Sequence, residues 1–146
     1  MHPYFSLQGR TALVTGGTRG IGKMIAKAFV EAGARVYICA RDPDACQQVA
    51  EELAAFGECR GLAANLASEE GVQQLAATLG QQLDSLDILV NNAGTTWGAP
   101  LESYPAKGWE KVMQLNVTSV FSCIQQLLPL LRLSLIHISE PTRLRR

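Results

Sequence analysis

The sequence has no excess of charge of either sign, because 13 lysines and arginines stand against 13 aspartates and glutamates. A balanced chain lacks the basic field that draws nucleic acid or anionic lipid to a protein, so neither is an expected partner. Long apolar runs are missing as well. The most apolar stretch, around residues 127–131, is interrupted by Pro129 and Arg132 and falls short of the roughly 20 residues that span a bilayer. We expect no membrane segment and a small-molecule partner.

Metal-ligand motifs and targeting signals are also absent from the sequence. The cysteines show no Cys-x-x-Cys spacing and no cluster of histidines beside them, which argues against a zinc site. The first five residues, MHPYF, have neither the basic start nor the apolar run of a secretory signal, so the expected compartment is the cytoplasm. In that compartment we expect reduced, mostly buried thiols at all four positions: Cys39, Cys46, Cys59 and Cys123.

What the sequence does contain, from Arg10 onward, is an alternation of short apolar runs with longer amphipathic stretches. This alternation is typical of repeated strand–helix–strand units and a parallel sheet. Asp42 and Ser68 are predicted N-caps of the second and third helices. The predicted strands are residues 11–15, 35–40, 59–64 and 86–90, and the predicted helices are residues 20–32, 43–56 and 69–83, with a fourth beginning near residue 107.

The fold class that follows is α/β: an incomplete, Rossmann-type doubly wound parallel sheet of about four strands in the order 3-2-1-4, with helices on both faces. A ligand crevice is expected between strands one and four. The fourth strand is apolar on both faces, yet no further strand is predicted after it, so it should form an exposed apolar edge. The first helix is predicted to have one apolar face, made of Ile21, Met24, Ile25, Ala28 and Phe29.

A glycine-rich turn joins the first strand to the first helix, with the sequence TGGTRGIG from Thr15. Gly16 allows a sharp turn off the strand, Gly20 allows the backbone to approach a pyrophosphate, and Gly22 allows close packing of the helix on the sheet. The helix N-terminus then offers N–H groups and positive dipole to phosphates. The alternative is that these glycines serve the turn alone.

Two further motifs lie along the chain. The segment NNAG, residues 91–94, follows the fourth strand, where small residues at the end of a central strand would admit a cofactor. Asn116 is a lone amide in an otherwise apolar helix. Together with the TGxxxGIG pattern of the glycine turn, these motifs resemble the short-chain dehydrogenase/reductase family over residues from about 8 to 132.

The resemblance implies a function for each matching residue. Asn116 aligns with the family's active-site asparagine, which kinks its helix and holds a water of the proton relay. A third segment, Asn65-Leu66 after the third strand, matches the family's position beside the adenine. The predicted cofactor-binding residues lie in these three segments and, for Arg41, directly after the second strand: Gly16, Thr18, Arg19, Gly20, Ile21, Gly22, Arg41, Asn65, Leu66, Asn92, Ala93 and Gly94.

The end of the second strand decides between the two nicotinamide cofactors. An acid there would bind the ribose 2′-hydroxyl of NAD and repel the 2′-phosphate of NADP. Here Ala40 is followed by Arg41, and Arg19 lies in the neighbouring turn, so two guanidinium groups can bind a phosphate. We predict NADP(H). Asp42 could take the ribose role instead.

Within the family, the chain is similar to 3-oxoacyl-acyl-carrier-protein reductases. That similarity implies an NADPH-dependent oxidoreductase that reduces a carrier-bound or small carbonyl compound, a 3-oxoacyl thioester, to a 3-hydroxyacyl product, with a homotetrameric parent protein. The family's catalytic Ser and Tyr-x-x-x-Lys are missing, since no Lys stands four residues after Tyr4, Tyr37 or Tyr104. We expect this chain to be inactive. The alternatives are a truncated, non-catalytic nucleotide-binding module and, less well matched, a Rossmann-type methyltransferase or epimerase.

The last residues of the chain do not resemble the family. Residues 133–143, LSLIHISEPTR, are similar to the translation of a transposase library adapter. We therefore predict that residues 1–132 are the N-terminal part of a dinucleotide-binding domain and that residues 133–146 are a non-native tail. His137 and Ser139 are accordingly not expected to be catalytic.

Overall fold

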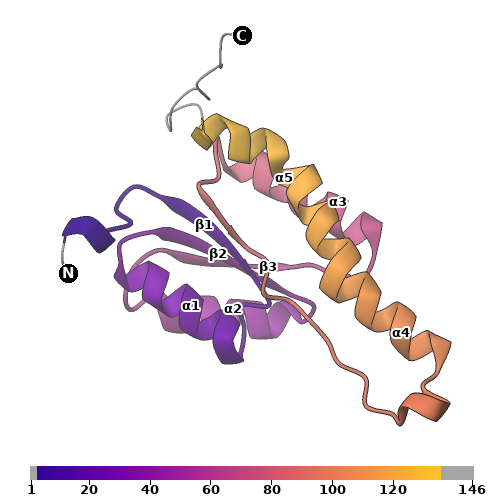
Figure 1. Cartoon of the computed structure of the whole chain (residues 1–146). Coiled ribbons are helices and arrows are strands. Elements are labelled where there is room, and N and C mark those ends of the chain that lie inside the picture. Colours follow the sequence, from indigo (N-terminus) through magenta and orange to yellow (C-terminus); the bar gives the residue numbers. More distant parts are fainter. Residues whose placement is uncertain (1–2, 136–146) are drawn as a thin grey trace, which may run out of the picture.

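The computed structural model describes residues 3–135, which form a four-stranded, all-parallel sheet in the order β3-β2-β1-β4 (Figure 1). The predicted fold class and strand order are confirmed. β4 is two residues shorter than predicted at its start, and β3 is one residue shorter at its end. The strands are β1 (Thr11–Thr15), β2 (Arg35–Ala40), β3 (Cys59–Ala63) and β4 (Ile88–Val90).

Helices cover both faces of the sheet, as expected of a doubly wound fold. α1 (Gly20–Glu31) and α2 (Pro43–Leu53) pack on one face, and α3 (Glu69–Gln82) and α5 (Ser119–Leu135) pack on the other (Figure 1). α4 (Ala106–Met113) lies beyond the sheet and continues into α5 through a π-helix, η3 (Gln114–Thr118). Two short 3-10 helices, η1 (Pro3–Phe5) and η2 (Leu101–Ser103), complete the described chain.

Alternate residues of the central strands divide the core into two clusters. Val14 and Ile38 point to the side of α1 and α2, while Leu13 and Tyr37 point to the side of α3 and α5. All four side chains are at most 1% exposed. This alternation explains why β1 and β2 are apolar throughout, because both of their faces are buried.

The apolar face predicted for α1 was wrong in part. The buried positions of α1 are Gly22, Ala26 and Val30, four residues apart, whereas Ile21 and Met24 are 66% and 64% exposed. The small residues face the sheet because the helix packs closely at the glycine turn, and this rotation leaves the larger side chains outside.

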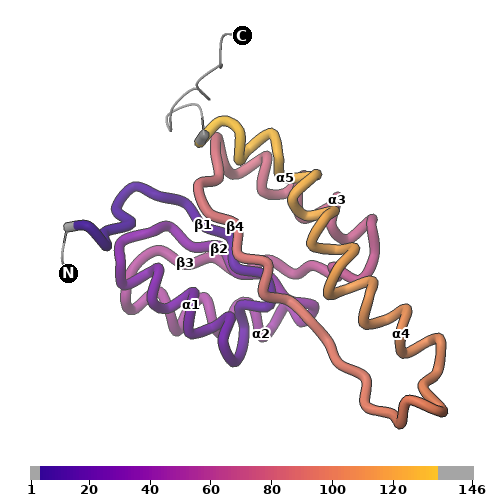
Figure 2. Tube along the Cα trace, viewed as in Figure 1, coloured from indigo at the N-terminus to yellow at the C-terminus, as the bar shows by residue number. Residues whose placement is uncertain are grey.

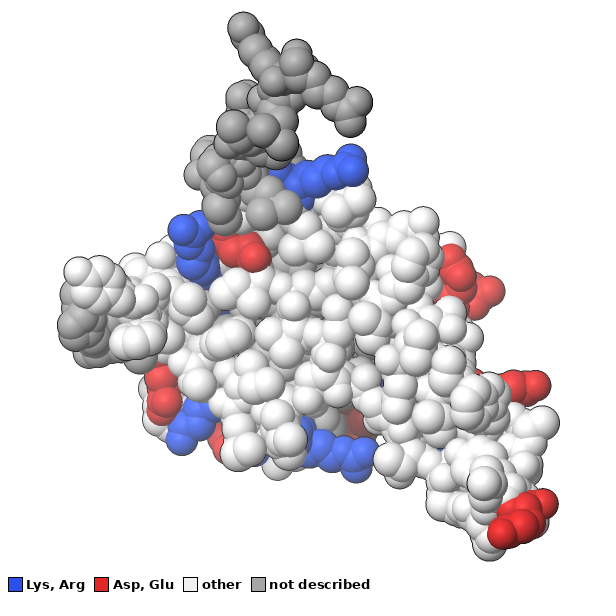
Figure 3. All heavy atoms as spheres, in the orientation of Figure 1, with Lys and Arg blue, Asp and Glu red and all other residues white. Residues whose placement is uncertain are grey.

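The edge position predicted for β4 is confirmed. Among residues 3–135, β4 pairs with β1 alone, and all three of its residues are partly exposed. On the face of the molecule that carries β4 and α5, charged side chains lie mostly around the periphery and leave the middle uncharged (Figure 3). Nor do the helices of the described part of the chain include one with the length and apolarity that crossing a membrane requires.

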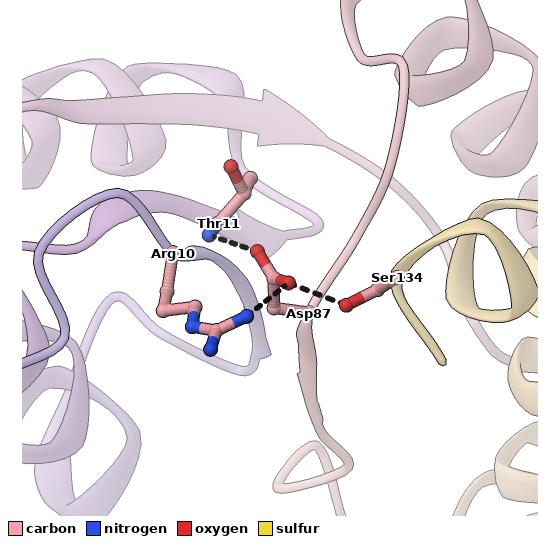
Figure 4. A network of polar contacts seen from close by, with 4 residues as sticks. All are labelled: Arg10, Thr11, Asp87 and Ser134. Carbon is pink, nitrogen blue, oxygen red and sulfur yellow. Dashed lines mark hydrogen bonds and ion pairs between the residues drawn. The ribbon is translucent and has the colours of Figure 1, made fainter. Parts of the chain in front are cut away.

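A polar network ties the amino-terminal ends of β1 and β4 together (Figure 4). One carboxylate oxygen of Asp87 accepts the Thr11 N–H at 2.8 Å, and the other accepts Arg10 Nη1 at 3.3 Å and the hydroxyl of Ser134. Burial raises the pKa of Asp87, but the donors from Ser134, Thr11 and Arg10 outweigh it and lower the pKa below its ordinary value. The network lies at the amino-terminal ends of β1 and β4, whereas the ligand crevice is predicted at their carboxyl-terminal ends.

Cysteines are distributed through the core as predicted. Cys39, Cys46 and Cys123 are buried, Cys59 is half-buried, and all four are free thiols. Burial raises the pKa of the Cys59 thiol to about 11. Burial, together with the neighbouring Cys123 and Cys46, raises the pKa of Cys39 to about 12. At neutral pH these two side chains are therefore protonated and poor nucleophiles.

Candidate functional site

The glycine turn leaves β1 in a conformation that needs glycine at two positions. Gly16 and Gly20 have φ of +65° and +54°, in the left-handed region that side chains disfavour. A Cβ at Gly22 would overlap the Gly16 carbonyl oxygen and the Asn92 side-chain nitrogen, so α1 packs directly on the turn. A Cβ at Gly20 would meet nothing within 4 Å. The backbone at Gly20 is therefore open to a ligand while Gly16 and Gly22 shape the turn.

Thr15 joins the end of β1 to the end of β4 and the segment that follows it. The sequence motifs did not predict this role. Its side chain is 1% exposed, and its hydroxyl accepts the N–H groups of Asn92 and Ala93, each at 3.0 Å. The same hydroxyl donates to the Val90 carbonyl at 3.3 Å. A buried threonine at the carboxyl end of β1, opposite the end of a neighbouring strand, was the only available sequence signal.

The Asn92 side chain reinforces this connection. Its Nδ2 donates to the backbone carbonyls of Thr15 at 3.0 Å and Gly16 at 3.2 Å. The amide therefore braces the glycine turn against the end of β4. Both of its N–H bonds are engaged by backbone, and the assignment of Asn92 to a cofactor site stays a prediction.

The N-terminus of α1 opens at this crevice without a side-chain cap. Arg19 takes the N-cap position with extended backbone (φ −155°, ψ 167°), its side chain accepts no N–H, and the first turn contains no acidic residue. The orphan N–H groups and positive dipole of α1 are thus available to an anion. This is the chemistry that the glycine spacing predicts.

The two predicted arginines lie beside that helix end. Arg41 directly follows β2, whose Cys39 carbonyl accepts the N–H groups of Gly16 and Gly17 at 2.8 and 3.3 Å. The end of β2 and the glycine turn are therefore adjacent. Both Arg19 and Arg41 are exposed, and within residues 3–135 neither side chain forms a hydrogen bond or an ion pair. Two unpaired guanidinium groups are available to one ligand.

The adenine-side residues that follow β3 differ in exposure. The Asn65 side chain is exposed, and its Oδ1 accepts the Ala67 N–H at 3.1 Å in the turn that precedes α3. Leu66 is 6% exposed and packs in the core cluster of α3. Only the backbone of Leu66 remains for a ligand, and the assignment of both residues to the adenine stays a prediction.

Asn116 lies in the π-helix and pairs with the loop after β4. Its Oδ1 accepts the Thr95 N–H at 2.8 Å, and its Nδ2 donates to the Thr95 carbonyl at 3.0 Å. A Cβ at Gly94 would lie 3.3 Å from the Asn116 Oδ1, so the loop passes close to the amide. Single-turn π-helices inside α-helices occur frequently at functional sites, and this one turns the Asn116 amide toward the crevice wall.

The remaining predicted cofactor residues lie where the motif places them. Thr18 is half-buried within the glycine turn, and Ile21 is exposed in the first turn of α1. Ala93 and Gly94 continue from Asn92 after β4, and a Cβ on Gly16 would lie 3.0 Å from the Ala93 Cα. The structure thus brings the glycine turn and the NNAG segment into contact and adds Asn116 through Thr95.

The short chain dehydrogenase family model matches residues 10–135, most of the chain. The chain belongs to this family. It is 69% identical over 134 residues to the rhamnolipids biosynthesis 3-oxoacyl-(acyl-carrier-protein) reductase of Pseudomonas aeruginosa, covering 92% of this chain and 52% of that protein. It is 39% identical to the 3-oxoacyl-(acyl-carrier-protein) reductase FabG of Aquifex aeolicus, over 82% of this chain and 49% of that one. The resemblance to this class of reductases is confirmed.

Among solved structures, the Pseudomonas aeruginosa RhlG/NADP active-site complex matches this chain with a TM-score of 0.90 and 69% identity, over 92% of this chain and 52% of that chain. The chain thus spans about half the length of the relatives it matches. The family match and α5 both extend to residue 135, past the predicted boundary at 132, while residues 136–146, with His137 and Ser139, lie outside the described residues. That boundary stays a prediction.

Proposed function

We propose that the chain binds NADP(H) in the crevice between β1 and β4, with the phosphates at the N-terminus of α1. One observation carries the proposal: α1 begins without a side-chain cap, at a glycine whose neighbourhood is open, and the exposed arginines at its N-cap and after the adjacent end of β2 have no partner in the described chain. Backbone N–H groups at Gly20 to Gly22 suit the pyrophosphate. Arg19 and Arg41 suit the 2′-phosphate.

The alternative cofactor, NAD, would need an acid for the ribose hydroxyls, and Asp42 stands nearest in sequence. Its Oδ1 already accepts the N–H groups of Asp44 and Ala45 at 2.9 and 3.4 Å, as the N-cap of α2. Turning this carboxylate toward a ribose would uncap α2, at a cost of about 1 kcal/mol. The contacts of Asp42 therefore favour NADP(H).

The reaction is proposed for the whole protein of which this chain is similar to one half. A 69% identical relative is named as a 3-oxoacyl-(acyl-carrier-protein) reductase, and we propose the same substrate class: a carrier-bound 3-oxoacyl thioester reduced to a 3-hydroxyacyl product. The cofactor supplies the hydride when bound. Asn116 would contribute by fixing the Thr95 segment at the crevice wall and by holding a water with its remaining hydrogen-bonding capacity.

Turnover by these 146 residues alone is not expected, because they contain no Tyr followed four residues later by Lys to donate a proton to the carbonyl. On this proposal the chain acts as a nucleotide-binding module. The whole protein is further proposed to be cytoplasmic and homotetrameric. The exposed apolar residues Val117, Phe121 and Ile124, 52%, 64% and 44% exposed on one side of η3 and α5, support an assembly through these helices.

Fluorescence titration of the chain with NADPH and with NADH tests the binding proposal. We expect saturable binding of NADPH, a weaker response to NADH, and no oxidation of NADPH when a 3-oxoacyl thioester is added. Arg41→Ala should weaken NADPH binding about tenfold or more, because it removes charge-assisted bonds to phosphate, and should leave NADH binding unchanged. Equal affinity for the two nucleotides, or an equal effect of Arg41→Ala on both, would overturn the assignment.

A further inference from the structure

The loop between β4 and α4 leaves the sheet and runs to the start of α4, and the helices α4 and α5 return from there toward the sheet (Figure 2). Residues 91–100 form no regular element and therefore have no ladder of backbone hydrogen bonds to hold them. Two contacts fasten the loop to the helix. One is the pair of hydrogen bonds between Thr95 and Asn116, and the other is made by Trp97.

Trp97 packs flat against α4 at Gly108. A Cβ built on Gly108 would lie 2.7 to 2.9 Å from three atoms of the Trp97 indole, so the ring occupies the space that any side chain would take. Gly108 is the one buried residue of α4. The Lys111 ammonium lies 5.6 Å from the ring centroid and adds a cation–π contact.

The glycine is otherwise unfavourable at this position. Glycine within a helix costs about 1 kcal/mol relative to alanine, and the φ of Gly108 is not in the region that requires glycine. The contact with the indole is the reason that the structure offers for it. Gly108 and Trp97 therefore form one packing unit.

The two contacts lie at matching points along the loop and the helix. Thr95 and Trp97 are two positions apart, while Asn116 and Gly108 are eight positions apart. Eight helical residues span about 12 Å and two extended residues about 7 Å, and the two contacts come in opposite chain order along the two segments. The loop thus runs antiparallel to the helix, fastened at both points.

We infer that Trp97 is a positioning residue for Asn116: by packing across Gly108 it keeps the Thr95 backbone on the Asn116 amide. Asn116 is exposed, and in water a pair of exposed hydrogen bonds adds little stability by itself. The apolar contact two residues away supplies the order that those bonds need. The consequence of this positioning for catalysis rests on the proposed function, whereas the contacts themselves do not.

Hydrogen exchange at the Thr95 amide, followed by NMR on the whole chain, tests the inference. Trp97→Ala should speed exchange of that amide about tenfold and approach the rate of Asn116→Ala, which removes the acceptor, while amides of β1 and α1 keep their rates. Trp97→Phe retains a ring over Gly108 and should restore most of the protection. Trp109→Ala is the matched control, because Trp109 is 62% exposed on the same helix and should leave Thr95 unaffected.

Gly108→Ala separates positioning from stability. Alanine favours the helix but its methyl group displaces the indole, so Thr95 exchange should accelerate although α4 is not weakened. Unchanged Thr95 exchange in both Trp97→Ala and Gly108→Ala, at the level of Trp109→Ala, would overturn the inference. A chain that fails to bind NADPH would count against the proposed function alone, because the exchange experiment uses no nucleotide.

Discussion

Three helices of the chain begin at the carboxyl edge of the sheet, and one of them begins differently. α2 starts with Asp42, whose carboxylate accepts two N–H groups, with Pro43 at its first position and Asp44 in its first turn. α3 starts with Ser68, whose hydroxyl accepts the Gly71 N–H at 3.1 Å, followed by Glu69 and Glu70. α1 has a basic residue, Arg19, at the N-cap, no side-chain acceptor and no acid in its first turn.

This difference is the basis for proposing the N-terminus of α1 as the anion site. Side-chain caps and first-turn acids satisfy orphan N–H groups and the positive dipole from within the chain. α2 and α3 are completed in this way. α1 forgoes that stabilisation and offers the same groups at a crevice whose two walls are braced by Thr15 and Asn92. The first three predictions below each alter one helix N-terminus and leave the others unchanged, and the fourth alters the network around Asp87.

The largest effect is expected from a side chain placed between α1 and the glycine turn. The methyl group in Gly22→Ala would overlap the Gly16 carbonyl and the Asn92 amide, forcing α1 off the turn. We expect no measurable NADPH binding and a loss of about 1–3 kcal/mol in the free energy of unfolding, the usual cost of overpacking. Gly80→Ala in α3 is the matched control, since its methyl group meets nothing within 4 Å. It should keep binding intact. A Gly22→Ala chain that binds NADPH normally contradicts the close packing.

A side-chain cap on α1 should raise the stability of the chain and lower its affinity for NADPH. Arg19→Asp places an acceptor on a backbone that is already extended, so the free energy of unfolding should rise by about 1 kcal/mol. NADPH affinity should fall about ten- to hundredfold, because the acid repels phosphate and a charge-assisted bond is lost. Denaturant unfolding and NADPH titration of the same preparation measure both. If stability and affinity change in the same direction, α1 is not an open anion site.

Removing the side-chain cap of α3 should lower the stability of the chain and leave the phosphate site intact. Ser68→Ala leaves the Gly71 N–H without its acceptor and should cost about 1 kcal/mol of stability at α3. NADPH affinity should change far less than in Arg19→Asp, because Ser68 lies in the turn of Asn65 and Leu66 and not at the phosphate-binding end of α1. Thermal unfolding with and without NADPH measures both quantities. A change in affinity as large as that of Arg19→Asp would remove the distinction between the helix ends.

The smallest effect is expected from Asp87, at the amino-terminal ends of β1 and β4. The pKa of Asp87 is lowered in the folded chain, so its stabilising contribution is fully present above the ordinary carboxyl pKa near 3.8 and is lost as the pH falls below it. Asp87→Asn should therefore flatten the acid limb of a stability–pH profile between about pH 5 and 2. NADPH affinity at pH 7 should be unaffected by the substitution. An unchanged acid limb would show that the network of Figure 4 adds nothing to stability.

Local rules explain what the sequence could predict. Strand order follows from the strand–helix alternation, and the caps at Asp42 and Ser68 follow from residue type alone, as do the glycines of the turn. The role of Thr15 could not be found in this way. It depends on how the ends of β1 and β4 meet, and any buried threonine looks alike in sequence.

Packing geometry explains the features that the sequence did not predict correctly. The buried face of α1 was misjudged because large apolar residues outweigh Ala26 and Gly22 in a periodicity argument, although small residues permit the closest contact with the sheet. The contact of Trp97 with Gly108 joins a loop to a helix, and neither residue signals the other at that separation. Such pairings are decided by tertiary structure.

The most direct measurement is the ratio of NADPH to NADH affinity for the unchanged chain and for Arg19→Asp. The two free arginines predict that NADPH binds at least about tenfold more tightly than NADH, and that the substitution removes most of this preference. Equal affinities in the unchanged chain, or a preference that survives Arg19→Asp, would contradict the claim that Arg19 and Arg41 bind the 2′-phosphate beside the uncapped end of α1.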